Sequence, residues 1–412
     1  MTKNEFLTKI YTKRRFGKRA GIEIMRDYLE SLSHPEHSMR IIHIAGTNGK
    51  GSTAAALSSI LESAGFSVGL FTSPHLIDFN ERIKINGKDI SDLDLMKYAE
   101  QVLNLEIFSE STMFDDALAM ALLYFKDRAC DYVILETGLG GRLDSTTGID
   151  EVPLVSIITK IGLDHTNILG NNIYDIAREK AGILKKGTTL VLSENLPLAR
   201  KGIIEIADDL DVPVIYAADY DVSTTHYALR GTFQRENMEN AVAAANILSE
   251  LDREFWKDRG VFLKKAIENG LTNAKWPGRM QVISNSPYII IDGAHNPQGI
   301  QALVQSLKDM FPGEKFVGLT AVLADKDHYN MIDRMSKILD KCYATEVSNP
   351  RALKASELAS EYRGMGVSTE EIDEIDKAFS EASKYAKEKD MKMVVYGSLY
   401  FIGAILEISK KE

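Results

Sequence analysis

The chain has 412 residues, of which 44% are hydrophobic and 26% charged, values that are ordinary for a globular protein of two or three domains. Its 49 basic and 59 acidic residues give a formal net charge of −10, which argues against binding to nucleic acid or to an anionic membrane. Two cysteines are too few for a disulfide scaffold, and no apolar stretch approaches the roughly 20 residues of a membrane span. We therefore expect a soluble, cytoplasmic protein.

Strand and helix patterns alternate through the first two-thirds of the chain. Helical stretches at 53–64 and 237–251 accompany short apolar runs at 41–45, 68–71, 132–135, 154–158, 190–192 and 214–216. This alternation predicts a mostly parallel, doubly wound α/β sheet. The segment 219–230, short and rich in Thr, Tyr and Val, predicts a small β excursion.

A domain boundary is indicated at 276–279, where Pro and Gly interrupt a helical pattern. Beyond it, apolar runs at 288–291, 316–319, 342–347 and 393–396 alternate with helical stretches such as 300–310 and 369–388. We predict a P-loop α/β domain over 1–279, followed by a smaller Rossmann-like α/β domain over 280–412.

A glycine-rich loop follows the first apolar run and precedes a helix, with the sequence Gly46-Thr47-Asn48-Gly49-Lys50-Gly51-Ser52. Glycines let backbone N–H groups turn toward one point, the helix N-terminus adds partial positive charge, and Lys50 adds a full one. The strict pattern G-x-x-x-x-G-K-[ST] is not matched, because Gly51 stands between Lys50 and Ser52. We predict a phosphate-binding loop; the alternative is a glycine-rich turn without a ligand.

Polar side chains follow three more apolar runs. Ser73 follows 68–71, Glu136 ends the run at 132–135, and His165 lies beyond the run at 154–158. Ligands of open α/β sheets bind at the carboxyl ends of the strands, and Mg²⁺ prefers hydroxyl and carboxylate oxygens. Three such groups beside a phosphate loop indicate a functional site. Taken singly, they would be a Ser-Pro turn, a solvated carboxylate and a structural or surface histidine.

Further polar motifs have plainer alternatives. Lys180, on or ending a helix, would ordinarily be a solvated surface lysine. In the second domain, Asp292 and His295 follow one apolar run and Ser398 follows another, so these side chains are expected at one sheet edge. Each is equally well a polar turn.

In combination, these strings resemble the folylpolyglutamate synthase and dihydrofolate synthase family of ADP-forming amide ligases, relatives of the Mur ligases. The resemblance spans nearly the whole chain, in family order: AGTNGKGS at 45–52, TSPHL at 72–76, ETGLGGRLD at 136–144, LDHT at 163–166, REKAGI at 178–183, WPGR at 276–279, DGAHNP at 292–297, DKD at 325–327 and GSLY at 397–400.

The resemblance implies roles in nucleotide binding. The loop from Gly46 to Ser52, with Lys50, would hold the phosphates of ATP. Asn237 and Arg279 would contact the nucleotide, and Asp292 would help hold its ribose.

The resemblance also implies two Mg²⁺ sites. Ser73 and Glu136 would contact one ion, and His165 a second metal position, as a ligand rather than as a general base. Lys180 would be the lysine that is carbamylated in this family, which supplies an oxygen anion where a plain ammonium would repel metal. Lys50, Lys180 and His165 are therefore the predicted catalytic residues.

The implied reaction begins with transfer of a phosphoryl group from ATP to a carboxylate of the pterin substrate. The amine of L-glutamate then attacks the acyl phosphate and forms an amide. His295 and Ser398 would belong to the region where glutamate is placed. The implied partners are ATP, L-glutamate, and a reduced folate or dihydropteroate, and the family architecture suggests a monomer.

One segment departs from the family. Where the family commonly shows T-x-F-E-x-x-T, associated with the pterin substrate, this chain has Asp115 in place of Glu and Leu118 in place of the last Thr. Phe79 and Arg82 are further candidates for stacking on or pairing with a pterin or carboxylate, the alternative being a solvated loop. The departure keeps open a ligase of the same mechanism that acts on a non-folate carboxylate. A nucleotide-gated binding protein on the same scaffold is the alternative from another class.

Overall fold

The computed structural model describes residues 1–13, 19–37, 39–260 and 262–410. The chain divides into two compact units, Met1–Ala228 with Arg235–Lys275, and Leu229–Gln234 with Trp276–Glu412. This division follows Lys275, whereas the sequence-based boundary follows Arg279. The short segment Leu229–Gln234 joins the second unit because the backbone N–H and the hydroxyl of Thr232 both lie 3.0 Å from Ser306 Oγ.

The first unit is built on an eight-stranded sheet in the order β4-β3-β2-β5-β1-β6-β7-β8. Its strands are β1 Ile41–Ala45, β2 Val68–Phe71, β3 Ile83–Ile85, β4 Lys88–Asp89, β5 Tyr132–Glu136, β6 Val155–Ile158, β7 Thr189–Leu192 and β8 Val214–Tyr216. In the part of the sheet with the order β2-β5-β1-β6-β7-β8, every neighbouring pair of strands is parallel. Strands β3 and β4, which the apolar runs did not predict, form an antiparallel edge beside β2. The predicted mostly parallel, doubly wound sheet is confirmed.

The predicted β excursion at 219–230 is wrong. After β8 the chain makes a short 3₁₀ turn, η4 (Ala217–Asp219), and residues 220–230 form turns and irregular structure. Asp221 accepts hydrogen bonds from the backbone N–H and the hydroxyl of Ser223. Such a local side-chain turn competes with strand pairing, so the β propensity of Thr, Tyr and Val does not decide the structure here.

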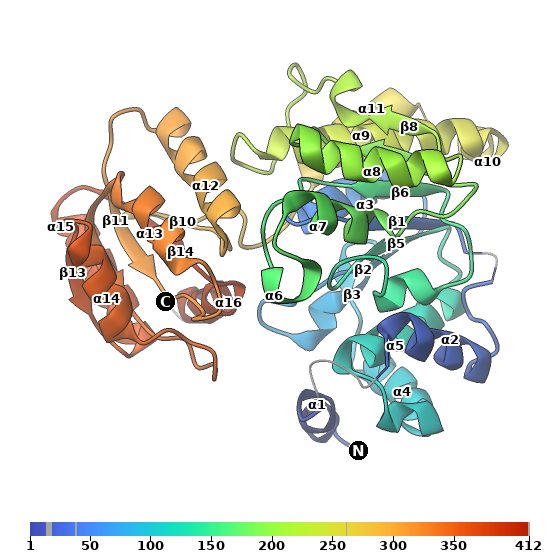
Figure 1. Ribbon diagram of the computed structural model, residues 1–412, viewed down its shortest axis with the longest axis horizontal. Helices are drawn as coiled ribbons and strands as arrows, with labels where there is room; N and C mark the ends of the chain where they lie inside the picture. The colour runs from blue at the N-terminus through green and yellow to red at the C-terminus, as the bar shows by residue number, and fades with distance from the viewer. Residues whose placement is uncertain (14–18, 38, 261, 411–412) are drawn as a thin grey trace. The chain divides into compact units, whose positions relative to one another are not determined.

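Helices cover both faces of this sheet (Figure 1). They are α1 Lys3–Tyr11, α2 Gly21–Ser31, α3 Lys50–Ser63, α4 Asp92–Leu103, α5 Met113–Asp127, α6 Thr166–Leu169, α7 Ile173–Ala181, α8 Pro197–Asp209, α9 Gln234–Leu251, α10 Arg253–Asp258 and α11 Leu263–Asn273, with 3₁₀ turns η1 Phe79–Arg82, η2 Glu106–Ser109 and η3 Ser145–Gly148. On one face, residues of α1, α2, α4 and α5 pack with Ile41, Phe71, Val133 and Leu135 in a single core. All five residues of β1 are buried, as expected for a strand covered on both faces.

A buried ion pair connects the N-terminal segment to α5. Lys13 Nζ lies 2.6 Å from Asp116 Oδ2, and Asp116 Oδ1 accepts hydrogen bonds from the hydroxyls of Tyr28 (2.6 Å) and Ser111 (2.5 Å). Burial raises the pKa of the Asp116 carboxyl and lowers that of the Lys13 ammonium. Each charge therefore depends on the other for compensation.

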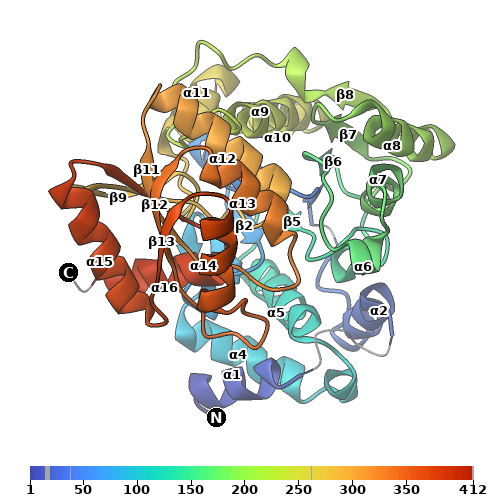
Figure 2. The same ribbon diagram turned by 60° about the vertical axis from the view of Figure 1, so that its left-hand side comes forward.

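The second unit contains a six-stranded sheet in the order β13-β12-β11-β14-β10-β9. Its strands are β9 Gln281–Asn285, β10 Tyr288–Ile291, β11 Phe316–Thr320, β12 Leu339–Ala344, β13 Ser368–Glu371 and β14 Lys392–Tyr396; its helices are α12 Pro297–Met310, α13 His328–Ser336, α14 Ala355–Gly364, α15 Ile375–Glu388 and α16 Leu399–Ser409. Helices α12, α13 and α14 lie on one face of the sheet and α15 lies on the other (Figure 2). The predicted smaller α/β fold is confirmed.

The prediction of one helix over 369–388 is wrong in its first residues. Residues Ser368–Glu371 form edge strand β13, which pairs in parallel with β12, and α15 begins only at Ile375. Thr369 is buried opposite Cys342, and Lys341 Nζ lies 2.6 Å from Glu370 Oε1. Pairing with a neighbouring strand thus overrides the weak local preference of Glu-rich sequence. In the described part of the chain, no helix is both long and apolar enough to cross a membrane.

We predict that Lys13→Met destabilises the first unit by about 3–5 kcal/mol, because it leaves the Asp116 carboxylate buried without its cation. Urea unfolding of the full chain, followed by circular dichroism, measures this change. Lys9→Met, on the exposed side of α1, is the matched control and should change stability by less than about 0.5 kcal/mol. Equal stability of the two variants would contradict the prediction.

Candidate active site

The carboxyl ends of four neighbouring strands bring the predicted residues of the first unit to one sheet edge. The order β2-β5-β1-β6 is parallel throughout. The glycine-rich loop follows β1, Ser73 follows β2, Glu136 is the last residue of β5, and His165 lies in the loop after β6. This is the edge at which open α/β sheets bind their ligands.

The glycine-rich loop is held to the segment that follows β6. The N–H groups of Thr47 and Asn48 donate to the carbonyl of Lys160, at 2.9 and 3.2 Å. Gly49 has φ of +94°, a left-handed conformation that favours glycine, and it is followed by Lys50, the first residue of α3. The amides at 47 and 48 thus serve the fold. The N–H groups of residues 50–52, in the first turn of α3, lie at a helix end of the kind that suits an anion.

Two lysines converge on one backbone oxygen. Lys50 Nζ lies 3.1 Å from the carbonyl oxygen of Gly46, and Lys180 Nζ lies 2.9 Å from the same atom. Lys50 Nζ is also 3.9 Å from Glu136 Oε1. Lys180 is only 5% exposed, so the interpretation of this residue as a solvated surface lysine is wrong. Lys180 is far from α3 in the sequence, so sequence patterns did not reveal that it lies close to Lys50.

Burial changes the protonation of Lys180. Desolvation, and next the charge of Lys50, lower the pKa of Lys180 to about 7, although Asp164 and Asp144 act in the opposite direction. A buried ammonium beside another ammonium is unfavourable, so a large fraction of this amine is neutral near pH 7.

The turn after Glu136 explains why Lys180 lies here. A Cβ atom on Gly141 would be 2.7 Å from the carbonyl oxygens of both Glu179 and Lys180, so only glycine allows this close approach. The Arg142 N–H donates to the Glu179 carbonyl at 2.8 Å, and the Arg142 guanidinium reaches the Glu179 carboxylate. Asp144, buried, accepts from the N–H groups at the start of the turn. The ETGLGGRLD string therefore sets the position of the end of α7.

Ser73 and Glu136 are in direct contact. The backbone N–H of Ser73 donates to Glu136 Oε2 at 3.0 Å, and Glu136 is 4% exposed. The interpretation of Glu136 as a solvated carboxylate is therefore wrong. The pair presents hydroxyl and carboxylate oxygens at adjacent strand ends, a donor set that suits Mg²⁺.

His165 occupies a left-handed position, with φ of +52°, at the start of the short helix α6. Its N–H donates to Asp164 Oδ1 at 2.8 Å, and its Nε2 lies 3.9 Å from the same oxygen. Because the Asp164 charge also acts on the Lys180 amine, the loop that carries His165 belongs to the surroundings of Lys180.

Asn237, in the first turns of α9, lies against the glycine-rich loop. A Cβ atom on Gly49 would be 2.2 Å from Asn237 Oδ1, and Thr53 Oγ1 donates to the Asn237 carbonyl at 3.5 Å. The two segments are far apart in the sequence, and tertiary structure alone brings them together.

The predicted pterin-binding residues are mostly buried. Phe79 is 1% exposed, and its ring packs edge-on against Phe6 at 6.1 Å. Arg82 Nε donates to Nδ1 of His75 at 2.8 Å, and burial lowers the pKa of His75 to about 3, which keeps the ring neutral. The solvated-loop interpretation is therefore wrong. Sequence reasoning missed His75, although TSPHL contains it.

Asp115 performs a structural task. Its carboxylate accepts hydrogen bonds from the N–H and the hydroxyl of Thr112, at 2.7 and 2.8 Å, in a capping box at the start of α5. The hydroxyl of Ser145 also donates to it. Although Asp is one methylene shorter than the Glu of the family motif, its carboxylate still caps the N-terminus of α5 through contacts within the first unit.

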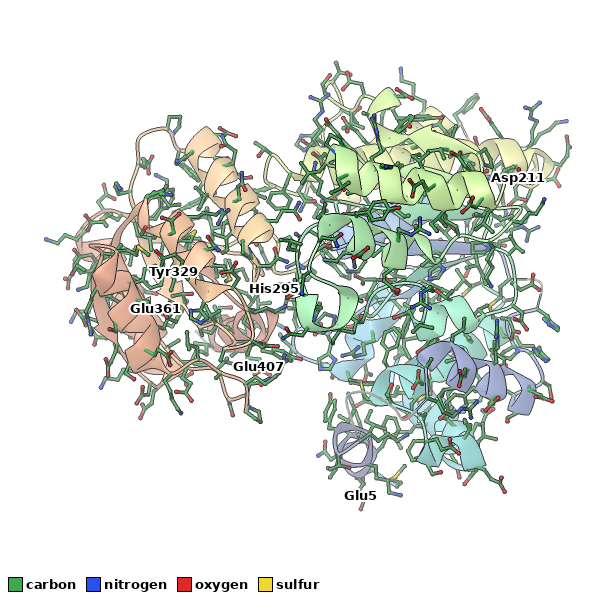
Figure 3. All side chains as sticks on the ribbon, viewed as in Figure 1. Glu5, Asp211, His295, Tyr329, Glu361 and Glu407 are labelled. Carbon is green, nitrogen blue, oxygen red and sulfur yellow. The ribbon has the colours of Figure 1, made fainter. Side chains whose placement is uncertain are left out.

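The second-unit candidates gather at the carboxyl edge of their own sheet. Asp292 follows β10 and accepts from the N–H groups of Met280 (2.9 Å) and Ala294 (2.8 Å). Arg279 lies near Asp292, and its charge opposes the upward shift that burial causes in the Asp292 pKa. His295, labelled in Figure 3, has Nδ1 2.8 Å from the Gly293 carbonyl. Ser398, 2% exposed, follows the adjacent strand β14.

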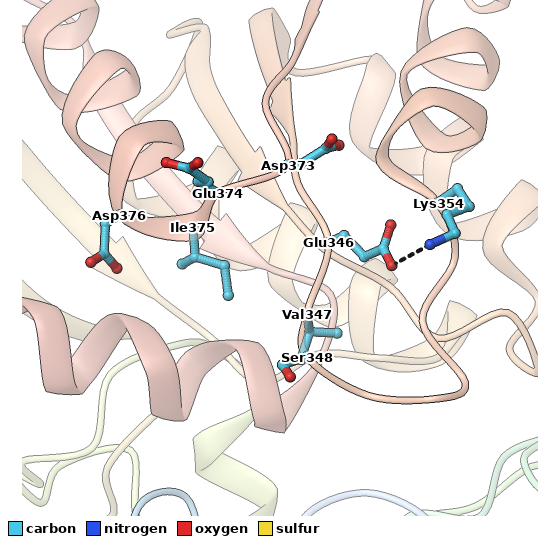
Figure 4. Close-up of a pocket in the computed structure, with 8 residues that line it drawn as sticks. All are labelled: Glu346, Val347, Ser348, Lys354, Asp373, Glu374, Ile375 and Asp376. Carbon is cyan, nitrogen blue, oxygen red and sulfur yellow. Dashed lines mark hydrogen bonds and ion pairs between the residues drawn. The ribbon is translucent and has the colours of Figure 1, made fainter.

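A separate cavity of about 610 Å³ in the second unit is not part of this group (Figure 4). Its single lysine, Lys354, is paired with Glu346 at 2.7 Å. The remaining carboxylates would repel an anionic ligand. The lining residues are Glu346, Val347, Ser348, Lys354, Asp373, Glu374, Ile375 and Asp376.

Comparison with known proteins gives a consistent result. Residues 44–209 match the Mur ligase middle domain, and residues 278–399 match the Mur ligase glutamate ligase domain. The dihydrofolate synthase/folylpolyglutamate synthase of Bacillus subtilis is 36% identical over 427 aligned positions, which cover 96% of each chain.

Solved structures agree. Mycobacterium tuberculosis folylpolyglutamate synthase complexed with ADP aligns at a TM-score of 0.88 and 26% identity, over 99% of each chain. The bifunctional folylpolyglutamate synthase/dihydrofolate synthase of Yersinia pestis, complexed with AMPPNP and a Mn ion, aligns at 0.85 and 28% identity, over 98% of this chain and 97% of that one. Since the likeness covers both units rather than a shared nucleotide-binding module alone, the chain belongs to the folylpolyglutamate synthase/dihydrofolate synthase family of Mur-type ligases.

Proposed function

We propose that this chain is an ATP-dependent ligase that adds L-glutamate to a reduced folate, and also to dihydropteroate, through an acyl phosphate. The observation that carries the proposal is the convergence of Lys50 and Lys180 on the Gly46 carbonyl, beside Glu136 and the N-terminus of α3. The positive charge of Lys50 at a helix N-terminus suits the phosphates of ATP, and the Lys180 amine beside it is the group proposed below to be carbamylated. The names of the relatives support the substrate assignment.

In this proposal, the first turn of α3 and Lys50 hold the ATP phosphates. Lys50 neutralises charge that develops as the γ-phosphoryl group passes to the substrate carboxylate. Asn237, which lies against Gly49, supports the loop and contacts the nucleotide; Arg279 and Asp292 take the remaining nucleotide contacts.

The donor atoms fit a divalent metal. Glu136 and Ser73 offer a carboxylate and a hydroxyl oxygen at adjacent strand ends, where the Ser73 backbone N–H donates to Glu136. His165 offers a ring nitrogen in the loop after β6. Bound Mg²⁺ supplies charge neutralisation on the phosphate oxygens. Glu136 and Ser73 would hold one ion, and His165 a second.

The second half of the reaction is an attack by the glutamate amine on the acyl carbon. The amide bond forms, the bond to phosphate breaks, and inorganic phosphate and one proton are released. No side-chain nucleophile is required. His295 and Ser398, at adjacent strand ends of the second sheet, would position L-glutamate, and Phe79, Arg82 and Asp115 would support the folate side through their buried contacts.

Lys180 carries the further proposal of carbamylation. Its neutral amine attacks CO₂, an N–C bond forms, and one proton is released, leaving a carbamate anion. This change replaces a buried cation beside Lys50 with an anion, which removes the repulsion between the two ammonium groups and adds oxygen ligands. The pKa of about 7 makes the neutral amine available.

We predict that Lys50→Ala lowers turnover by about 10²-fold or more, because the developing phosphoryl charge loses its cation. Phosphate release with ATP, Mg²⁺, glutamate and folate measures it. Lys201→Ala, at an exposed position on α8, should retain wild-type turnover. Near-normal activity of Lys50→Ala would remove the phosphate-loop argument.

We predict phosphate release only when ATP, L-glutamate and either tetrahydrofolate or dihydropteroate are all present. The two pterin substrates are offered separately, and the amide product is identified by mass spectrometry. No release with either would contradict the folate assignment and favour a ligase for another carboxylate. ATP binding with no amide product from any carboxylate would favour the binding-protein alternative.

We predict a carbamate carbon signal in ¹³C NMR spectra of the protein equilibrated with ¹³C-bicarbonate. The signal should be absent in Lys180→Gln and present in Lys186→Gln, which alters an exposed lysine. At constant dissolved CO₂, the signal should grow as pH rises through about 7, because deprotonation of the Lys180 amine (pKa about 7) precedes carbamylation. A signal that persists in Lys180→Gln would refute the assignment.

A further inference from the structure

A second group of potential metal ligands lies outside the predicted active site. His34, Glu36 and His37 occupy the connection between α2 and β1, within four consecutive residues. Their ligand atoms all lie within 4.8 Å of one another. No motif of the family resemblance includes these residues, and the proposed reaction does not use them.

The carboxylate at the centre of this group is fully buried. Glu36 is 0% exposed. Its Oε1 lies 2.9 Å from Nδ1 of His34 and 3.9 Å from Nε2 of His37. Its other oxygen, Oε2, has no hydrogen-bond partner among the residues that the structure describes. A buried carboxylate oxygen without a donor is costly, and a bound cation would compensate the charge of this carboxylate.

The two histidines reach this carboxylate from the solvent side. Their side chains are 35% and 60% exposed, so an ion has a path from solution. Two atoms bound to one tetrahedral zinc are about 3.3 Å apart, a value that lies between the 2.9 and 3.9 Å that separate Glu36 Oε1 from the two histidine nitrogens. The connection also starts from an unusual backbone, since Ser33 and His34 both have positive φ, of 58° and 50°.

We propose that His34, Glu36 and His37 form a binding site for a borderline divalent cation of the Zn²⁺ class, with water as the fourth ligand. Two imidazole nitrogens and one carboxylate oxygen form the donor set that Zn²⁺ favours, whereas Mg²⁺ prefers oxygen ligands and octahedral geometry. The site is therefore chemically distinct from the oxygen-rich group around Glu136.

Binding requires one local movement. The two rings are stacked, with centroids 4.6 Å apart and planes 4° from parallel. A ring nitrogen binds a metal ion that lies in the plane of its ring. Two rings stacked face to face have separate planes, so they cannot both bind one ion in this arrangement. The ring of His37, the more exposed of the two, turns out of the stack while Glu36 stays in place. The ion then fixes the connection that leads from α2 into β1, the strand that precedes the glycine-rich loop.

The test is a titration of the full-length, metal-free protein with Co²⁺ and Zn²⁺ in excess Mg²⁺, which occupies the oxygen-rich group. We expect one equivalent of Co²⁺ with the visible absorption of a four-coordinate ion, displaced by Zn²⁺, and a higher midpoint of thermal unfolding with Zn²⁺ than with chelator. His37→Ala and Glu36→Gln should each weaken Co²⁺ affinity by at least about tenfold.

The controls separate this site from others. His226→Ala removes an exposed histidine elsewhere in the first unit and should bind Co²⁺ as the wild type does. His37→Ala changes a mostly exposed side chain, so it should fold and retain ligase activity in Mg²⁺. Absence of saturable binding in the wild type would overturn the proposal, as would equal Co²⁺ affinity in wild type, His37→Ala and Glu36→Gln.

Discussion

Burial of the Lys180 amine beside the charge of Lys50 is the main constraint on the predicted active site. Lys50 and Lys180 donate to the same Gly46 carbonyl, at 3.1 and 2.9 Å, and Lys180 is almost completely buried. The fold holds this amine beside the charged Lys50 at the end of β1, where an anion would be favourable. ATP phosphates and a carbamate on Lys180 are the two anions that the proposed function supplies.

Much of the first unit is arranged to hold these groups in place. The turn after Glu136 approaches the last residues of α7 so closely that Gly141 cannot carry a side chain. The carbonyl of Lys160 accepts hydrogen bonds from the start of the glycine-rich loop. The side chain of Asn237, on α9, packs closely against Gly49 of the same loop. Each contact joins segments that are distant in the chain, so the site depends on the complete sheet rather than on any single motif.

The residues predicted to bind the pterin differ from these groups, because their side chains are buried in contacts within the first unit. Phe79, Arg82 and Asp115 are all buried and satisfied by neighbours inside the first unit. The replacement of the family's Glu by Asp115 is accommodated as a helix cap, because a carboxylate one methylene shorter still reaches the Thr112 N–H.

The sequence by itself determined the alternation of strands and helices, the place of the glycine-rich loop and the family, because these depend on local patterns and on short motifs. Propensity failed at 219–230 and at 369–371, where an Asp221 turn and pairing with β12 decided the outcome. Only the tertiary structure decided that Lys180 is buried beside Lys50, that Phe79 is inside the core, and that the Glu36 carboxylate is fully buried. Burial and charge proximity arise from packing between segments far apart in the chain, and no local pattern of residues encodes them.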